Sequence, residues 1–265
     1  PARRVICLRT ALVLACILMP VSGTAAEPAV PSLHQAGIGR FQFDRQPQQG
    51  ALVRGIVPPR TVRLVIDGRE VAFAADRHFI AGFGRDHAAT STVTAFLDDG
   101  SSITEKLSVS PTRWIVENLS GLPHHAQPDA EFQARRPAEL EQIAAARRTE
   151  TGAEGWRQDF IWPVPGRITG HFGAQRIYAG EPGAPHAGVD LAGRIGAPVV
   201  APADGIVILA AASPFTLEGN LLMIDHGMGL NSAFLHLSRI DVKVGDTVRQ
   251  GQPIGAVGMT GRATG

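Results

Sequence analysis

Glycine and proline recur so closely along this sequence that little of it could form long helices. The 265 residues contain 30 glycines and 19 prolines, while 44% are hydrophobic and 18% are charged. Turn-forming residues in such numbers, placed between apolar segments, indicate a globular chain of short strands rather than a disordered one. We therefore predict a mostly β protein that is large enough for two small domains.

The first 26 residues have the pattern of a secretory signal peptide. Three arginines precede an apolar stretch over 11–19, and small residues that end at Ala26 follow it. This arrangement predicts cleavage after Ala26 and release into the periplasm or the medium. A lipoprotein signal with lipid attached at Cys16 is the alternative, although the chain stays apolar beyond that cysteine.

Removal of residues 1–26 changes both the net charge and the cysteine content. The whole chain has a formal net charge of +1, and loss of three arginines without any acid leaves −2. So little positive charge argues against nucleic-acid binding. Both cysteines, Cys7 and Cys16, are lost with the signal, which excludes thiol nucleophiles and cysteine-based zinc sites. No apolar run in the remaining chain approaches the roughly 20 residues of a membrane span.

Composition divides the remaining chain into three parts. Residues 27–120 contain short alternating segments separated by turn residues, and they predict a small β-sandwich. Residues 121–156 are rich in Pro, Glu, Arg and Ala, and they predict a linker with a helix over 137–149 that starts at Pro137. Residues 157–265 return to glycine-rich segments without a helical period, and they predict a second, almost all-β domain.

Turn chemistry locates individual strands. The Asp67-Gly68 pair lies between two apolar segments, 62–66 and 69–74, and predicts a hairpin because these two residues readily adopt positive φ angles. In the C-terminal part, alternation and turn residues predict strands over 199–201, 205–211, 220–225, 232–237 and 253–258.

His186 and Asp190 could bind one metal ion only if the backbone folds back between them. Two ligands of a tetrahedral zinc lie about 3 to 3.5 Å apart, whereas a straight strand separates residues four apart by about 13 Å. Gly188, with Pro185 upstream, permits the bend. A His-x-x-x-Asp pattern also arises by chance, so an ordinary surface pair is the alternative.

Three other histidines lie in the same region. Alternation places His236 on one strand face with Phe234 and Ser232, an arrangement typical of a hydrogen-bonded core histidine. His226 and His171 lie next to turn residues, and we expect them to be structural or exposed.

Several motifs follow one another along residues 157–265. They include Phe160-Ile-Trp-Pro-Val-Pro-Gly, Pro185-His-Ala-Gly-Val-Asp, Phe234-Leu-His-Leu-Ser and Val244-Gly-Asp-Thr-Val. In this order they resemble the M23 peptidases, the lysostaphin and LytM-type zinc endopeptidases of peptidoglycan. The resemblance implies an antiparallel β domain of LytM type, zinc bound by His186 and Asp190, and His236 as the active-site histidine that is not a ligand. It also implies peptidoglycan peptides as the substrate.

The sequence departs from the family pattern in two places. Phe234 stands where many members have tyrosine. The family's His-x-His motif, which supplies the third zinc ligand, follows a Thr-Gly stretch, whereas here Thr260-Gly-Arg-Ala-Thr-Gly is the end of the sequence. We therefore expect residues 1–265 to be an inactive part of a longer product, with the M23 domain incomplete at its C-terminus. The whole product is expected to be a secreted zinc endopeptidase of peptidoglycan; the alternative is a degenerate relative that binds cell wall or activates an amidase.

Overall fold

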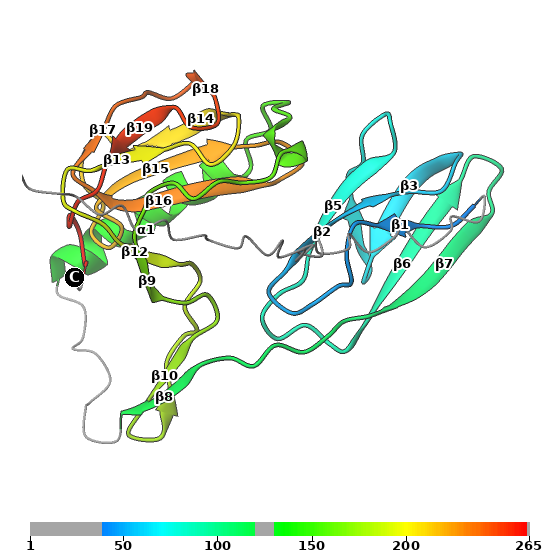
Figure 1. The fold of residues 1–265 in the computed structure, drawn as a ribbon, viewed down its shortest axis with the longest axis horizontal. Helices are drawn as coiled ribbons and strands as arrows, with labels where there is room; N and C mark the ends of the chain where they lie inside the picture. The colour runs from blue at the N-terminus through cyan, green and yellow to red at the C-terminus, as the bar shows by residue number, and fades with distance from the viewer. Residues whose placement is uncertain (1–38, 120–129, 264–265) are drawn as a thin grey trace, which may run out of the picture. The chain divides into compact units, whose positions relative to one another are not determined.

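The computed structural model describes residues 39–119 and 130–263. The predicted signal peptide over 1–26 lies outside these residues. Residues Leu33–Gly265 form one compact unit, built mostly from short strands (Figure 1). The described residues include one α-helix, α1 (Ala130–Arg147), which comes between an N-terminal group of sheets and a C-terminal group. No helix in these two stretches has the length and apolar character needed to cross a membrane.

Two antiparallel sheets make up the N-terminal part. One has the order β1-β2-β5 and the other the order β4-β3-β6-β7. Their strands are β1 (Gln42–Phe43), β2 (Leu52–Ile56), β3 (Thr61–Ile66), β4 (Arg69–Val71), β5 (His78–Gly82), β6 (Thr90–Leu97) and β7 (Ser102–Ser108). Alternate residues of both sheets meet in one core that contains Phe41, Val57, Leu64, Ile66, Phe79, Val93 and Ala95.

The hairpin predicted at Asp67-Gly68 is confirmed. Leu64 pairs with Val71 across β3 and β4, and the two turn residues have φ angles of 48° and 77°. Positive φ at both central residues is the mark of the type I′ turn that suits the twist of a hairpin. Asp67 also accepts hydrogen bonds from the Thr92 backbone at 2.8 Å and the Ser91 hydroxyl at 2.7 Å, which attach the turn to β6.

The helix starts earlier than predicted. It begins at Ala130, so Pro137 lies inside α1 instead of at its first turn. Proline is unfavourable in a helix interior because it lacks an N–H and crowds the preceding turn. Side chains on either side of it compensate, since Arg135 and Arg136 both lie 3.4 Å from the carboxylate of buried Glu139. Local sequence signals favoured Pro137 as a start, whereas long-range contacts of Arg136 with Glu218 and of Glu139 with Thr216 hold the helix on both sides of it.

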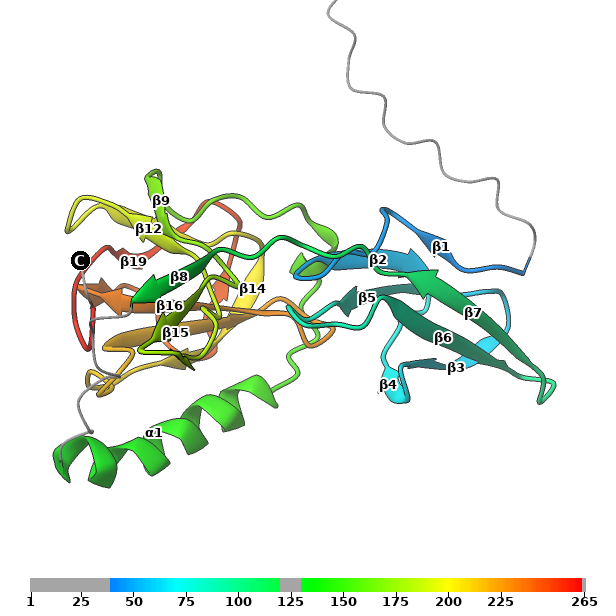
Figure 2. The ribbon, with the colours of Figure 1, turned by 90° about the horizontal axis from the view of Figure 1, so that it is seen from below.

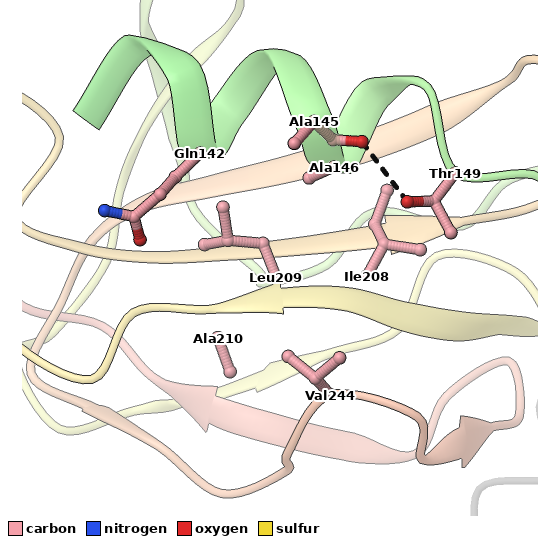
Figure 3. Close-up of a pocket in the computed structure, with 8 residues that line it drawn as sticks. All are labelled: Gln142, Ala145, Ala146, Thr149, Ile208, Leu209, Ala210 and Val244. Atoms are coloured by element: carbon pink, nitrogen blue, oxygen red, sulfur yellow. Dashed lines mark hydrogen bonds between the residues drawn. The ribbon is translucent and has the colours of Figure 1, made fainter. Parts of the chain in front are cut away.

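Apolar packing fixes α1 on the C-terminal sheets. Its buried residues Ile143 and Ala146 join a cluster with Leu209, Phe215, Leu221 and Met223. Figure 3 shows the helix lying over β14 (Gly205–Ala210), with Leu209 between them.

The C-terminal part is a set of small sheets around a second core. Its main sheet is antiparallel with the order β16-β15-β14-β18, and a three-stranded sheet has the order β13-β19-β17. Their remaining strands are β13 (Pro198–Val200), β15 (Asn220–Asp225), β16 (Asn231–Leu237), β17 (Arg239–Ile240), β18 (Thr247–Val248) and β19 (Pro253–Ala256). The five strands predicted here are present; 220–225 has the predicted ends, and the others differ by one or two residues. The core contains Val199, Ala201, Val207, Leu222, Ile224, Leu237, Val248 and Ile254.

A smaller sheet joins distant parts of the chain. Strand β8 (Val116–Leu119) pairs in parallel with β10 (Gln175–Tyr178), which pairs with β11 (Glu181–Pro182). Next along the chain, β12 (Asp190–Ala192) pairs with β9 (Arg167–Gly170). The segment that leads into His186 therefore lies beside a strand that follows the N-terminal sheets directly.

Candidate metal centre

His186 and Asp190 lie side by side. The Nε2 atom of His186 is 3.2 Å from Oδ1 of Asp190. Asp190 is the first residue of β12, and the pairing of β12 with β9 shifts register immediately after it. The chain also bends at Gly188, between the two residues, as the sequence required for the two side chains to meet. Their separation matches the distance of about 3 to 3.5 Å between two ligands of one tetrahedral zinc.

Hydrogen bonding determines which nitrogen of His186 is free. Its Nδ1 lies 3.2 Å from the backbone carbonyl oxygen of His171, and a carbonyl can only accept. When Nδ1 donates to this carbonyl, Nε2 faces the Asp190 carboxylate either as an N–H that donates to it or as a lone pair. Two acceptors at this distance repel each other unless a proton or a cation lies between them. A carbonyl that fixes the other ring nitrogen is also typical of histidines that bind metal.

The nitrogen and carboxylate donors of this pair suit zinc. The side chains of His186 and Asp190 are 34% and 64% exposed, so an ion and a substrate could reach them from solvent. No group of three or more His, Cys, Asp or Glu side chains with metal-binding geometry occurs among residues 39–119 and 130–263. The described chain therefore supplies two donors.

His236 has an unusual backbone conformation. Its φ angle is 62°, in a region that costs a residue other than glycine about 1 to 2 kcal/mol. The cause is a bulge in β16: Leu222 pairs with Phe234 and Asn220 with Leu237, so β16 contains one extra residue. The His236 N–H donates to the Glu218 carbonyl at 2.8 Å instead of to the facing strand. Bulges of this kind often re-aim a side chain beside an active site.

The ring of His236 is oriented by a second backbone carbonyl. Its Nδ1 lies 2.8 Å from the carbonyl oxygen of Thr260, so Nδ1 carries the proton and Nε2 keeps a lone pair. Alternation predicted that His236 would share a face with Phe234. Both side chains are half-buried while Leu235 between them is exposed, although the bulge breaks the regular period. The imidazole is therefore available at Nε2 to accept or donate a proton.

His226 is structural, as its position at a strand end predicted. It is fully buried, with Nδ1 2.7 Å from the Asp204 carbonyl oxygen and Nε2 2.7 Å from the Ser232 hydroxyl. Burial lowers the pKa of His226 below its ordinary value of 6.5, despite the Asp204 carbonyl and the nearby carboxylates. His171 is exposed and contributes only its carbonyl to His186. The orienting carbonyls of His171 and Thr260 carried no sequence signal, because every residue has one.

The groove between α1 and β14 is a separate feature. It encloses about 330 Å³, and the close-up in Figure 3 shows that aliphatic and small polar side chains line it. None of its lining residues titrates near neutral pH or contacts His186, Asp190 or His236. It is therefore no part of the candidate metal centre. The lining residues are Gln142, Ala145, Ala146, Thr149, Ile208, Leu209, Ala210 and Val244.

The C-terminal part of the chain is similar in sequence to known cell-wall proteins. Residues 184–265 match Peptidase family M23. Peptidoglycan DD-endopeptidase ShyA of Vibrio cholerae is 42% identical over 100 residues, which are 37% of this chain and 23% of ShyA. Murein hydrolase activator NlpD of Salmonella dublin is 33% identical over 121 residues, 46% of this chain and 29% of NlpD. The chain thus spans less than a third of the length of either relative.

A solved structure extends the similarity beyond the matched region. A protein from Pseudomonas aeruginosa assigned to peptidase M23 is 27% identical, with a TM-score of 0.62 over 83% of this chain and 87% of that one. So wide a match includes the N-terminal sheets as well as the C-terminal ones.

Proposed function

Because residues 184–265 belong to peptidase family M23, we propose that this protein is a secreted zinc endopeptidase that hydrolyses peptide bonds of bacterial peptidoglycan. The observation that carries the proposal is the position of Nε2 of His186, 3.2 Å from Oδ1 of Asp190, which is the separation of two ligands of one tetrahedral zinc. Imidazole nitrogen and carboxylate oxygen are both zinc ligands, so a zinc ion would fit between these two side chains. The DD-endopeptidase ShyA, 42% identical over its shared region, favours the same substrate class.

The chain's own residues divide the work between coordination and proton transfer. His186 and Asp190 would hold zinc, and zinc when bound lowers the pKa of a water molecule and polarises a carbonyl group. Nε2 of His236 would accept a proton from the attacking water as its oxygen bonds to the scissile carbonyl carbon. The same nitrogen would pass that proton to the amine as the carbon–nitrogen bond breaks. Thr260 keeps the ring in the tautomer that this exchange needs.

The remaining features are consistent with work on the cell wall. The signal peptide pattern over 1–26 would deliver the protein to the periplasm or the medium. We interpret the N-terminal sheets as a small β-sandwich over 27–120, joined through the linker at 121–156 to the LytM-like domain.

The test measures zinc and hydrolysis together in the full-length gene product. We expect wild-type protein to contain zinc by atomic absorption and to release soluble fragments from purified peptidoglycan. His186→Ala and Asp190→Ala should lose both properties, because each removes a ligand of the same ion. His78→Ala is a matched control, since His78 lies in β5 and pairs with Asp76. Retention of zinc and hydrolysis by Asp190→Ala would refute the assignment.

The second candidate function is activation of another wall hydrolase. The similarity to NlpD, whose name describes a murein hydrolase activator, favours it. In that case the full-length protein would hold no zinc and release no fragments, yet it would accelerate an amidase acting on the same wall. The gene sequence after the codon for Gly265 gives an independent test, because only an enzyme needs the family's His-x-His motif there.

A further inference from the structure

The position of His186 depends on the backbone of residues 171–174. The Gly173 N–H donates to the His186 carbonyl at 2.8 Å, and the His186 N–H donates to the Ala174 carbonyl at 2.7 Å. The His171 carbonyl holds the His186 ring. Any movement of this short stretch would therefore move the imidazole relative to Asp190.

That stretch has little apolar support from the C-terminal sheets. Phe172 is 36% exposed, and the core clusters of the described residues include nothing between 165 and 198. A segment without buried apolar contacts opens easily unless something else holds it.

Arg85, in the turn after β5, supplies one restraint. Its Nε donates to the Gly173 carbonyl at 2.8 Å, and its Nη2 donates to Oε1 of Gln175 at 3.1 Å. Gly173 is thus fixed at both polar groups, with its carbonyl held by Arg85 and its N–H bonded to His186. Arg85 is therefore linked to His186, the candidate zinc ligand, through Gly173 alone.

Trp114 supplies a second restraint from the segment before β8. Its ring packs edge-on against Phe172, with centroids 5.8 Å apart, and it lies so close to Gly173 that a Cβ there would overlap it. The indole N–H is buried without a hydrogen-bond partner among the described residues, so the ring acts through packing. The pairing of β8 with β10 fixes the same region, because the Gln175 N–H donates to the Ile115 carbonyl at 2.9 Å.

We propose that Arg85 and Trp114 are positioning residues for His186, and that the N-terminal sheets thereby complete the metal centre. This role rests on the proposed function only in taking His186 as a zinc ligand. The N-terminal part would then preorganise a ligand that its own domain leaves poorly supported, which is the usual task of groups behind a metal site.

The test compares Arg85→Ala with Arg54→Ala in the full-length protein. Arg54 also joins the N-terminal sheets to the C-terminal part, through Asp159 at 3.0 Å and the Trp156 carbonyl at 3.2 Å, but it does not touch residues 171–186. Hydrogen exchange, read by mass spectrometry without added metal, measures how often residues 171–186 open. The exchange of β14 and β15 in the same protein is the reference. Competition with a zinc chelator measures metal affinity.

We expect Arg85→Ala to increase exchange over 171–186 alone and to weaken zinc binding about tenfold, the lower end of the effect of residues behind a metal ligand. Trp114→Ala should act similarly, Trp114→Phe should remain near wild type, and Arg85→Lys should be intermediate because it keeps only one bond. Arg54→Ala should change neither measurement. Equal effects of Arg85→Ala and Arg54→Ala, or no change in Arg85→Ala, would overturn the proposal. A wild-type protein without zinc would instead overturn the proposed function. The exchange measurement would still test whether Arg85 and Trp114 hold residues 171–186 in place.

Discussion

Arg136 in α1 donates two hydrogen bonds, of 2.6 and 2.8 Å, to the carboxylate of Glu218 in the turn before β15. The backbone carbonyl of Glu218 in turn accepts the N–H of His236. The helix is thereby connected to the candidate proton-transfer residue through a single amino acid.

Arg136→Ala should lower the free energy of unfolding by about 3 kcal/mol. It leaves the Glu218 carboxylate without its partner, and breaking a buried ion pair costs about 3 to 5 kcal/mol. The lower figure applies because the side chains of Arg136 and Glu218 are still 17% and 10% exposed to solvent. Arg148→Ala, one residue after the helix, is the control, since its pair with Glu141 is well exposed and should contribute less than about 1 kcal/mol. Urea unfolding that gives equal losses for both variants would contradict this interpretation.

His236→Ala should separate zinc binding from turnover. The imidazole is assigned to proton transfer and not to coordination, so zinc content should stay at the wild-type level. Hydrolysis of peptidoglycan should fall by about 10² to 10⁴, the usual contribution of general acid–base catalysis. Atomic absorption and fragment release on the same preparation measure both quantities. Loss of zinc in this variant would make His236 a ligand instead.

Gly219→Ala should lower both stability and turnover. Gly219 has a φ angle of 64°, and a Cβ there would overlap the side chain and carbonyl of Thr260, the group that orients His236. Gly229 has a similar φ of 74° with open space around it. Gly229→Ala should therefore cost only the conformational strain of about 1 to 2 kcal/mol. Equal unfolding energies, together with normal turnover in Gly219→Ala, would exclude the proposed link between Thr260 and His236.

His226 should make the protein less stable as the solution becomes acidic. Burial lowers the pKa of His226 in the folded state, so the unfolded chain binds a proton more readily. Above the unfolded pKa of about 6.5 both states are neutral and nothing is lost. As the pH falls below that value toward the folded pKa, stability should decrease. His226→Gln cannot titrate, so urea unfolding between pH 7 and 5 should give a flatter profile than wild type; identical slopes would be inconsistent with this origin.

Local sequence signals located the Asp67-Gly68 hairpin and the five C-terminal strands predicted above, and they allowed for a bend between His186 and Asp190. The hairpin follows from short-range chemistry, because Asp67 and Gly68 readily adopt the positive φ angles that its turn needs. The predicted start of α1 was wrong because contacts with the turn before β15, from Arg136 to Glu218 and from Glu139 to Thr216, hold the helix on both sides of Pro137.

Long-range contacts were beyond sequence reasoning. Trp114 packs on Phe172, which is far from it in the sequence. The bulge that gives His236 its positive φ depends on pairing with β15 and on carbonyls from two other loops. The rings of His186 and His236 are oriented by backbone carbonyl groups. Every residue has a carbonyl, so the sequence could not indicate these orientations.

The parallel pairing of β8 with β10 also bears on how the protein behaves when it is shortened. A protein that began at Ala130 would lose β8, and one side of β10 would present unpaired backbone donors and acceptors to the solvent. Open strand edges recruit other chains by the same hydrogen bonds that join a sheet. Such a shortened protein should therefore tend to self-associate, and in the longer protein β8 would prevent this by covering that edge.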